Sequence, residues 1–420
     1  MADTFGIEQN KLIEKSGVRK VFTPHAPVEF QDLLFGRSEA LKQIIKQIHT
    51  PGAFPILFGD RGVGKTSIAS IIKLLVEISM DDKKNVYIEL KRCSSTETLD
   101  SIFKNVIKKC GIDINLVEST KTTESNGGAG INAGFAKANL GAKRTSTEKH
   151  SPADKNFTPS AIAELISENF KHGLLIIDET DAIKDEQVKY QLAEIVKLLS
   201  DSRSDFKIML VGVAELSSAL TAGHPSIGRC AVETKLDRMK DSAIQQIITV
   251  GASKIKPSID FDSQVLKRIV QLAGGYPYFA HLCALKCVED AISDNRKFVR
   301  IHHLPKALKS ATLEAEQSLR TSFDSSAASA TTNKFRIVID AASRFGCENF
   351  SAADLRRKIE EVHKVNIAQP ALNNLFKRLV GDNHLCILHR VAKGTYRFSD
   401  PRMPSFVKIV CESEAHYPNK

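Results

Sequence analysis

Residues 59–66 carry the clearest chemistry in this sequence. They read G-D-R-G-V-G-K-T and match the phosphate-binding pattern G-x-x-x-x-G-K-[ST]. Glycines allow backbone N–H groups to curl around phosphate oxygens, and a helix that starts behind the loop adds its positive end. Lys65 supplies a mobile cation for the outer phosphates, and the Thr66 hydroxyl suits a Mg²⁺ ligand. The residues predicted to bind a nucleotide here are Gly59, Asp60, Arg61, Gly62, Val63, Gly64, Lys65, Thr66 and Ser67.

A second chemical signal is the carboxylate pair Asp178-Glu179, which directly follows the apolar run 174–177. A carboxylate at the end of a buried strand can hold Mg²⁺ through water, while its neighbour polarises the water that attacks a γ-phosphate. We therefore expect Thr66 and Asp178 at the metal and Glu179 as the catalytic base. An acidic start to a surface loop is the alternative for this pair.

A GTPase is the nearest rival among nucleotide enzymes. Residues 234–237, T-K-L-D, fit the guanine-recognition pattern [NT]-K-x-D. However, Asp178 is followed by Glu, Thr and Asp, so the glycine of the D-x-x-G pattern is missing. The segment 231–238 fits the last strand of a sheet equally well. The sequence therefore favours ATP.

An α/β scaffold must position these residues. Apolar runs at 56–58, 85–90, 174–177 and 208–211 predict strands, and helical patterns lie between them. Strands that alternate with helices predict a mostly parallel sheet. Between residues 241 and 319 only helical patterns occur, which predicts a separate helical domain.

The last ninety residues predict a winged helix-turn-helix. Helices are expected at about 334–344, from Ser351, and at about 370–379, followed by a β-hairpin around residues 392–394. From Thr331 onward there are fifteen Lys/Arg against nine Asp/Glu, so six of the ten net positive charges lie here. On double-stranded DNA the third helix would enter the major groove. The residues expected to contact DNA are Asn373, Asn374, Lys377, Arg390 and Lys393.

The order of these motifs resembles that of an AAA+ P-loop ATPase with a helical lid and a C-terminal winged helix. It is close to archaeal origin-recognition-type initiators and to prokaryotic STAND ATPases, over about residues 30–415. Residues 59–66 resemble the Walker A motif, and residues 174–179 resemble the Walker B motif. The resemblance of Phe35-Gly36-Arg37 to the family's G-R-x-x-x-L box implies that Arg37 lies near the nucleotide.

The resemblance also implies an arginine finger. Residues 224–229 occupy the place of the S-x-x-R box, so Arg229 would reach the γ-phosphate of a neighbouring subunit in a head-to-tail homo-oligomer. One such arginine raises the hydrolysis rate by about 10³-fold or more. A surface arginine after a turn is the alternative for Arg229.

Two departures from the family pattern imply slow, switch-like hydrolysis. The strand before Gly212 lacks the Asn, Thr or Ser of sensor 1, and residues 274–277 (G-G-Y-P) replace the sensor 2 arginine. His281 lies close in sequence to this motif and either faces the nucleotide or belongs to a helix core, which we favour. Cys283 and Cys287 with His281 fit a metal site or the same apolar core, and their apolar neighbours favour the core.

Composition sets the domain organisation. Hydrophobic residues make up 42% and charged residues 26% of 420 residues, which is ordinary for a globular protein. The apolar runs are too short for a membrane span, no leader pattern is present, and the eight cysteines form no C-x-x-C pair, so we expect free thiols in the cytoplasm. The predicted units are an extended lead-in (1–30), an AAA+ core (31–238) with a flexible insertion (118–156), a lid (239–321), a linker (322–332) and a winged helix (333–420).

Two functions remain open at this point. The first is an ATP-binding and ATP-hydrolysing regulator, with Mg²⁺, that couples its nucleotide state to DNA binding through the winged helix. The second is a STAND-like signalling or antiviral-defence ATPase that oligomerises on ATP and uses the winged helix to dock a protein partner.

Overall fold

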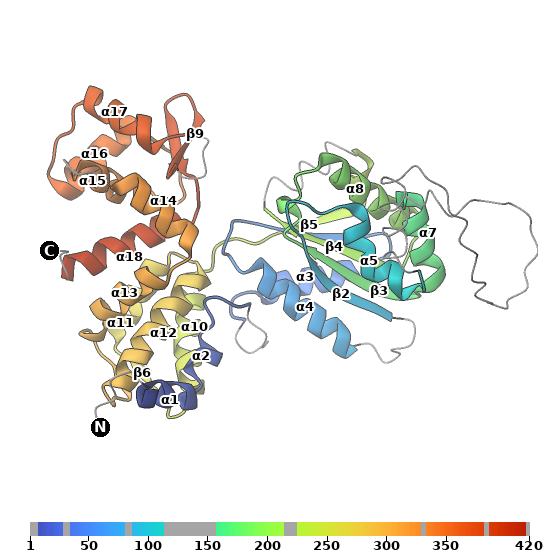
Figure 1. Cartoon of the computed structure of the whole chain (residues 1–420), viewed down its shortest axis with the longest axis horizontal. Coiled ribbons are helices and arrows are strands. Elements are labelled where there is room, and N and C mark those ends of the chain that lie inside the picture. Colours follow the sequence, from blue (N-terminus) through green and yellow to red (C-terminus); the bar gives the residue numbers. More distant parts are fainter. Residues whose placement is uncertain are drawn as a thin grey trace, which may run out of the picture.

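The computed structural model describes residues 7–27, 34–79, 86–112, 157–213, 225–328, 333–381 and 386–416. Within these ranges the chain forms an α/β lobe and a helical lobe, which Figure 1 shows on the right and on the left. The predicted insertion 118–156 lies outside the described residues, and so does His224 of the S-x-x-R region.

A five-stranded parallel sheet forms the centre of the α/β lobe, which confirms the predicted parallel α/β sheet. Its strand order is β2-β3-β4-β1-β5. The strands are β1 (Phe54–Phe58), β2 (Val86–Arg92), β3 (His172–Asp178), β4 (Phe206–Gly212) and β5 (Ala231–Lys235). Because the carboxyl ends of parallel strands share one edge, the loop after β1 and the carboxylates after β3 open on the same side, separated by β4.

Helices cover both faces of this sheet. The helices are α3 (Ser38–Ile48), α4 (Lys65–Ser79), α5 (Leu99–Lys109), α7 (Pro159–Asn169) and α8 (Glu186–Asp201). Along β3 the side chains alternate, so that Leu174 packs into the cluster with α3 and α4 and Leu175 into the cluster with α5, α7 and α8. The result is a three-layer α/β/α lobe.

The helical lobe begins with a region of five helices, which we call the helical region. They are α10 (Asp241–Lys254), α11 (Ser263–Ala273), α12 (Pro277–Ser293), α13 (His303–Glu314) and α14 (Gln317–Ala327). Two short parallel strands, β6 (Asp260–Phe261) and β7 (Phe298–Val299), accompany them. Helix α12 runs through the core, with both Cys283 and Cys287 fully buried.

Two expected conformations are wrong. The lead-in 1–30 is not extended throughout, because α1 (Ile7–Ser16) and α2 (Val18–Val21) are helical and pack on α12. Their buried residues Ile13 and Val18 meet an apolar partner that the local pattern does not reveal. The expected linker 322–332 is helical as far as Ala327, since Phe323 is buried against Phe406.

The C-terminal module, residues 334–416, completes the helical lobe. Its elements are α15 (Lys334–Ser343), β8 (Phe350–Ser351), α16 (Ala352–His363), α17 (Gln369–Leu379), β9 (Leu388–Ala392), β10 (Thr395–Phe398) and α18 (Met403–His416). The three strands form an antiparallel sheet in the order β8-β10-β9. Ser351 and Asp354 form the capping box that the sequence predicts at the start of α16. Helix α18, which the sequence did not reveal, packs on α11, α13 and α15.

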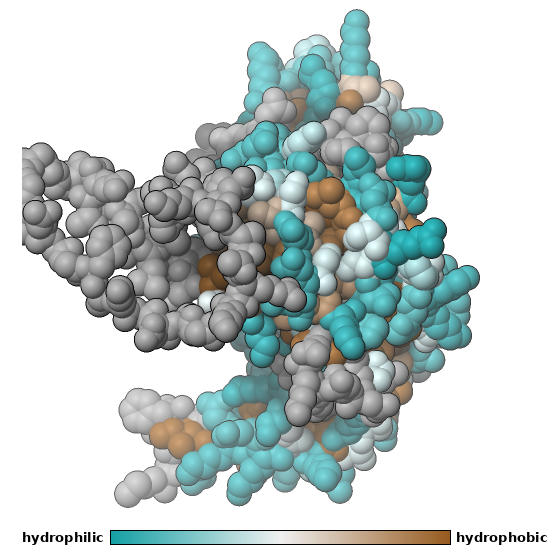
Figure 2. All heavy atoms as spheres, turned by 90° about the vertical axis from the view of Figure 1, so that its right-hand side faces the viewer, coloured by the Kyte–Doolittle hydropathy of each residue, from teal (hydrophilic) through white to brown (hydrophobic). Residues whose placement is uncertain are grey.

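The surface at the far end of the α/β lobe is mostly hydrophilic, with smaller apolar areas between the hydrophilic residues (Figure 2). Among the residues that the structure describes, no helix combines the length and the apolar character needed to cross a membrane.

Candidate nucleotide site

The phosphate loop joins the end of β1 to the start of α4. Gly62 and Gly64 have positive φ angles of 82° and 98°, a region that favours glycine. The Lys65 ammonium donates hydrogen bonds of 2.9 Å to the carbonyl oxygens of Gly59 and Asp60. Burial lowers the pKa of Lys65, and the carboxylates of Asp181 and Asp178 oppose this shift. The lysine is therefore folded back over its own loop, close to two carboxylates.

The beginning of the loop lies directly against the segment that follows β5. A Cβ on Gly59 would lie 2.3 Å from the carbonyl oxygen of Leu236. The backbone N–H of Leu236 in turn donates to the carbonyl of Phe58 at 2.7 Å. Only glycine fits between these two backbones, so the sequence pattern at this position has a steric cause as well as a chemical one.

Asp178 is buried at the end of β3, with 2% of its surface exposed. Its Oδ1 accepts a hydrogen bond of 2.9 Å from the N–H of Glu179, whereas Oδ2 is buried and has no hydrogen-bond partner within the described ranges. A buried carboxylate oxygen with unused lone pairs fits a Mg²⁺ ligand or its bound water, and the hydroxyl of Thr66 is a second hard oxygen donor. The donor set therefore fits the metal predicted from the sequence.

Glu179 is exposed and has a left-handed backbone, with φ 57° and ψ 37°. This conformation is uncommon for residues other than glycine, and it occurs often where function constrains the backbone. The turn lets Asp178 stay buried while the next carboxylate reaches solvent. The two carboxylates therefore have the different surroundings that a metal ligand and a base require.

Asp181 is a site residue that the sequence analysis missed. It lies in the short helix η2 (Thr180–Ala182), and its Oδ1 accepts a hydrogen bond of 3.1 Å from the N–H of Val213, just after β4. It is also the largest favourable charge acting on Lys65. The sequence shows Asp181 as a further acidic residue two positions after Glu179, but its position beside β4 could be seen only in the fold.

Arg37 lies beside the phosphate loop, and its guanidinium is bonded to backbone. It donates to the carbonyl of Val63 at 2.7 Å and to that of Asp237 at 2.8 Å, and it is 7% exposed. Burial lowers the pKa of Arg37 to about 10, although the charge of Asp237 opposes this. In this conformation Arg37 clamps the phosphate loop to the segment after β5.

His281 is a core histidine in this structure. Its Nδ1 accepts a hydrogen bond of 3.2 Å from the N–H of Thr23, and its ring lies edge-on to Phe22. Burial lowers the pKa of His281 to about 4. The thiols of Cys283 and Cys287 on the same helix are buried in the apolar core, which raises the pKa of both.

This histidine predicts a pH dependence of stability. Because the folded pKa of His281 lies below the ordinary value of 6.5, its contribution is complete above pH 6.5 and is lost as the pH falls toward 4. The slope for one group is about 1.4 kcal/mol per pH unit. His281→Gln should flatten the decline of the unfolding free energy over this interval, measured by urea titration with circular dichroism. His25→Gln, at an exposed histidine two residues after Thr23, should keep the decline. Equal slopes for the two variants would contradict the assignment.

Arg229 and the residues predicted to contact DNA do not belong to the phosphate loop or to the segments described above. Arg229 is exposed at the end of η3 (Pro225–Arg229), just before β5. In the C-terminal module the outward positions of α17 and of the β9–β10 hairpin are exposed, and they include Asn373, Asn374, Lys377, Arg390 and Lys393.

The guanine-recognition pattern falls on a strand. Thr234 and Lys235 belong to β5 and pair with Leu57 and Phe58. The Thr234 hydroxyl accepts a hydrogen bond from the side chain of Gln47 at 3.1 Å, and Lys235 pairs with Asp237 at 2.9 Å. The first half of the pattern thus belongs to the edge strand of the sheet, where both residues have partners, which weighs against the GTPase interpretation.

Comparisons with known proteins agree with this geometry. Residues 48–220 match the family model described as an AAA domain. These residues form an AAA domain. The match contains the phosphate loop, Asp178 and Glu179, so the site lies within the AAA domain. No curated protein matches the chain significantly.

Alignments with three solved structures extend beyond the AAA domain, and the first of them supports a shared fold. Aeropyrum pernix ORC2, in its ADPNP–ADP complexes, is 14% identical with a TM-score of 0.51, and the alignment covers 96% of this chain and 99% of that one. A. pernix ORC1 in complex with DNA is 14% identical with a TM-score of 0.49, over 94% and 96%. A Walker-type ATPase of Pyrococcus abyssi is 15% identical with a TM-score of 0.48, over 91% and 99%.

Proposed function

We propose that this chain binds ATP at the phosphate loop, hydrolyses it slowly, and uses the nucleotide state to control DNA binding by its C-terminal module. The observation that carries the proposal is the meeting of three groups at one edge of the sheet. Lys65 lies within reach of the loop, Asp178 presents an unsatisfied buried oxygen, and Glu179 presents an exposed carboxylate. These are the parts that phosphoryl transfer to water requires.

Each residue has a distinct task in this proposal. The backbone N–H groups of the loop and Lys65 bind the phosphates, while Thr66 and Asp178 would hold Mg²⁺. When bound, the metal neutralises charge that develops on the phosphate oxygens. Glu179 orients and polarises the attacking water, and Asp181 positions the end of β4 beside it.

Slow turnover follows from what lies beside the attacking water. Val213, just after β4, has an apolar side chain and offers its backbone N–H, which is already bonded to Asp181. The segment 274–277 of the helical region contains no arginine. With fewer groups to stabilise the transition state, the nucleotide state lasts long enough to serve as a switch.

The C-terminal module supplies the output. Its helix order and three-stranded sheet fit a winged helix, in which α17 would enter the major groove and the β9–β10 hairpin would follow the backbone. The α17 face with Asn373, Asn374 and Lys377 is polar and exposed, opposite the buried Leu372 and Leu375. Asn side chains suit adenine edges, and Lys377 and Lys393 suit phosphates.

This assignment predicts the effect of two substitutions. The double variant Lys377→Ala/Lys393→Ala should weaken binding to duplex DNA and reduce the slope of log K against log salt by about 1 for each lost phosphate contact. Fluorescence anisotropy over a salt series measures both quantities. Lys358→Ala is the control, because this lysine pairs with Glu361 on α16. An unchanged slope in the double variant would exclude this face.

The STAND-like signalling function stays as the second candidate, since Arg229 is exposed where a head-to-tail neighbour would use it. It predicts that ATP drives oligomerisation and that DNA does not bind. Mass measurement of the Glu179→Gln variant with ATP separates the candidates: a monomer that binds DNA tightly excludes the second, and an ATP-dependent oligomer without DNA affinity excludes the first.

A further inference from the structure

Arg402 brings the C-terminal module into direct contact with the phosphate loop. It lies just before α18 and is 4% exposed. A Cβ on Gly62 would lie 2.6 Å from Cδ and 3.2 Å from Cγ of Arg402, so the aliphatic part of this arginine packs against the loop backbone. The contact joins segments that are far apart in the sequence.

Two carboxylates hold the guanidinium in place. Arg402 pairs with Asp400 at 2.8 Å and with Glu316, which precedes α14. Burial alone would raise the pKa of Glu316, but the hydrogen bond and the charge of Arg402, together with Ser318 and Arg61, lower it. The other oxygen of Glu316 lies 3.9 Å from Arg61 of the loop. Arg402 and Glu316 therefore contact the loop from two neighbouring positions.

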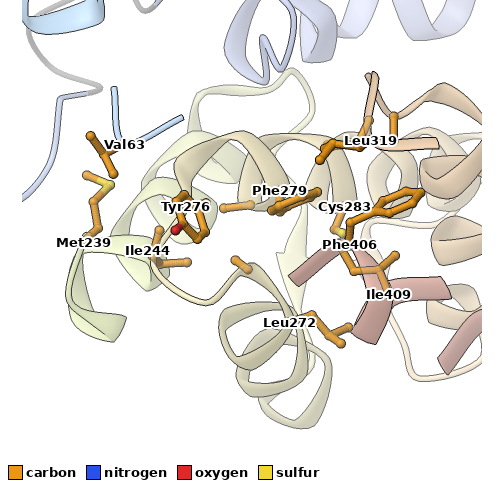
Figure 3. Close-up of a cluster of buried hydrophobic side chains, with 14 of the residues drawn as sticks. Val63, Met239, Ile244, Leu272, Tyr276, Phe279, Cys283, Leu319, Phe406 and Ile409 are labelled. Carbon is orange, nitrogen blue, oxygen red and sulfur yellow. The ribbon is translucent and has the colours of Figure 1, made fainter. Parts of the chain in front are cut away.

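The helix that follows Arg402 is anchored in the helical region. Figure 3 shows Phe406 and Ile409 of α18 in the same buried cluster as Leu272 and Leu319. The Ser405 hydroxyl also donates to the carbonyl of Ala273 at 3.2 Å. Arg402 is therefore fixed to the packed unit of the helical region and the C-terminal module. It contacts the phosphate loop close to residues 274–277, the segment that contains no arginine.

Cys347 lies close to the contact between Arg402 and the phosphate loop, which we call the junction, and its reactivity can report whether the junction is closed. Its thiol lies 3.1 Å from the Tyr276 hydroxyl and donates to the carbonyl of Pro401 at 3.0 Å. Cys347 also lines a cavity of about 560 Å³ together with Asp60 of the phosphate loop and Asp237. Burial raises the pKa of Cys347, so its alkylation is slow while the junction is closed.

We propose that Arg402 is a positioning residue for the phosphate loop and couples phosphate occupancy to the C-terminal module. The inference rests on the proposed function. Bound phosphates would draw Lys65 away from the carbonyls of Gly59 and Asp60 and reduce the motion of the loop. A less mobile loop would then stabilise its contact with Arg402, and so with the helical region and the C-terminal module. Coupling between two sites is reciprocal, so ATP closes the junction as strongly as the closed junction favours ATP.

The test measures the alkylation of Cys347 by iodoacetamide in the full chain, with peptide mass spectrometry to separate the eight cysteines. A Glu179→Gln background keeps ATP intact during the reaction. ATP with Mg²⁺ should slow the alkylation by at least about fivefold. Adding Arg402→Ala should remove this protection at saturating ATP, and Arg402→Lys, which keeps the charge but not the forked geometry, should restore part of it.

Two further variants make the result decisive. Arg357→Ala removes an exposed, ion-paired arginine of the same module and should leave the protection unchanged. Glu316→Gln releases one anchor at a half-exposed position and should lose part of the protection even if Arg402→Ala fails to fold. ATP binding without protection in the parent, or full protection in Arg402→Ala and Glu316→Gln, overturns the proposal for Arg402 alone. Absence of fluorescent ATP binding in the parent would remove the proposed function as well.

Discussion

Lys65→Ala should weaken ATP binding by about 100-fold or more. Lys65 is the cation at the start of α4, and its ammonium donates hydrogen bonds to the carbonyls of Gly59 and Asp60. Each charge-assisted hydrogen bond to a phosphate contributes about 1.5–3 kcal/mol, and every 1.4 kcal/mol is tenfold in affinity, so losing two gives this effect. Titration with a fluorescent ATP analogue measures it directly.

Lys73→Ala is the matched control for this variant. Lys73 lies on the same helix and pairs with Glu77 at 3.5 Å on the surface, so its loss should change ATP affinity little. The thermal unfolding midpoint of both variants should stay close to that of the parent. Equal ATP affinity of Lys65→Ala and Lys73→Ala would show that the loop is not a phosphate site.

Glu179→Gln should bind ATP nearly as well as the parent and hydrolyse it about 10²–10⁴-fold more slowly. The substitution keeps the shape of the exposed side chain but removes the carboxylate that polarises water. Because Asp178 stays in place, metal and nucleotide binding should persist. Single-turnover release of phosphate separates chemistry from product release in this comparison.

Glu186→Gln serves as the control for Glu179→Gln, since Glu186 is an exposed glutamate that pairs with Lys189 at the start of α8. Its turnover should equal that of the parent. If Glu179→Gln hydrolyses ATP as fast as Glu186→Gln does, another group activates the water, and Asp181 would be the next residue to change.

Local sequence was enough to predict the loop and the strand that carry the candidate site. Residues 59–66 have glycines where the backbone turns sharply, and residues 174–179 have the pattern of a buried strand that ends in carboxylates. Both are properties of short segments, so they could be recognised without knowing the fold. The exposed face of α17 was predictable for the same reason, because helical periodicity separates Leu372 and Leu375 from the outward positions.

Contacts between distant segments could not be predicted in this way. Arg402 contacts Gly62 only because α18 packs into the helical region, and no local pattern links the two. The helices of residues 7–21 likewise become stable against α12, since their apolar residues are too few for an isolated helix. The bonds of Arg37 to two carbonyls also depend on tertiary structure, because one carbonyl belongs to Asp237, which is distant in the sequence.

The central claim is that nucleotide state controls DNA binding, and one titration tests it most directly. Duplex DNA is titrated with the Glu179→Gln variant at low salt, once with ATP and Mg²⁺ and once with ADP and Mg²⁺, and anisotropy gives both affinities. The account predicts affinities that differ by at least about fivefold between ATP and ADP. Equal affinities, or no DNA binding in either state, would contradict it.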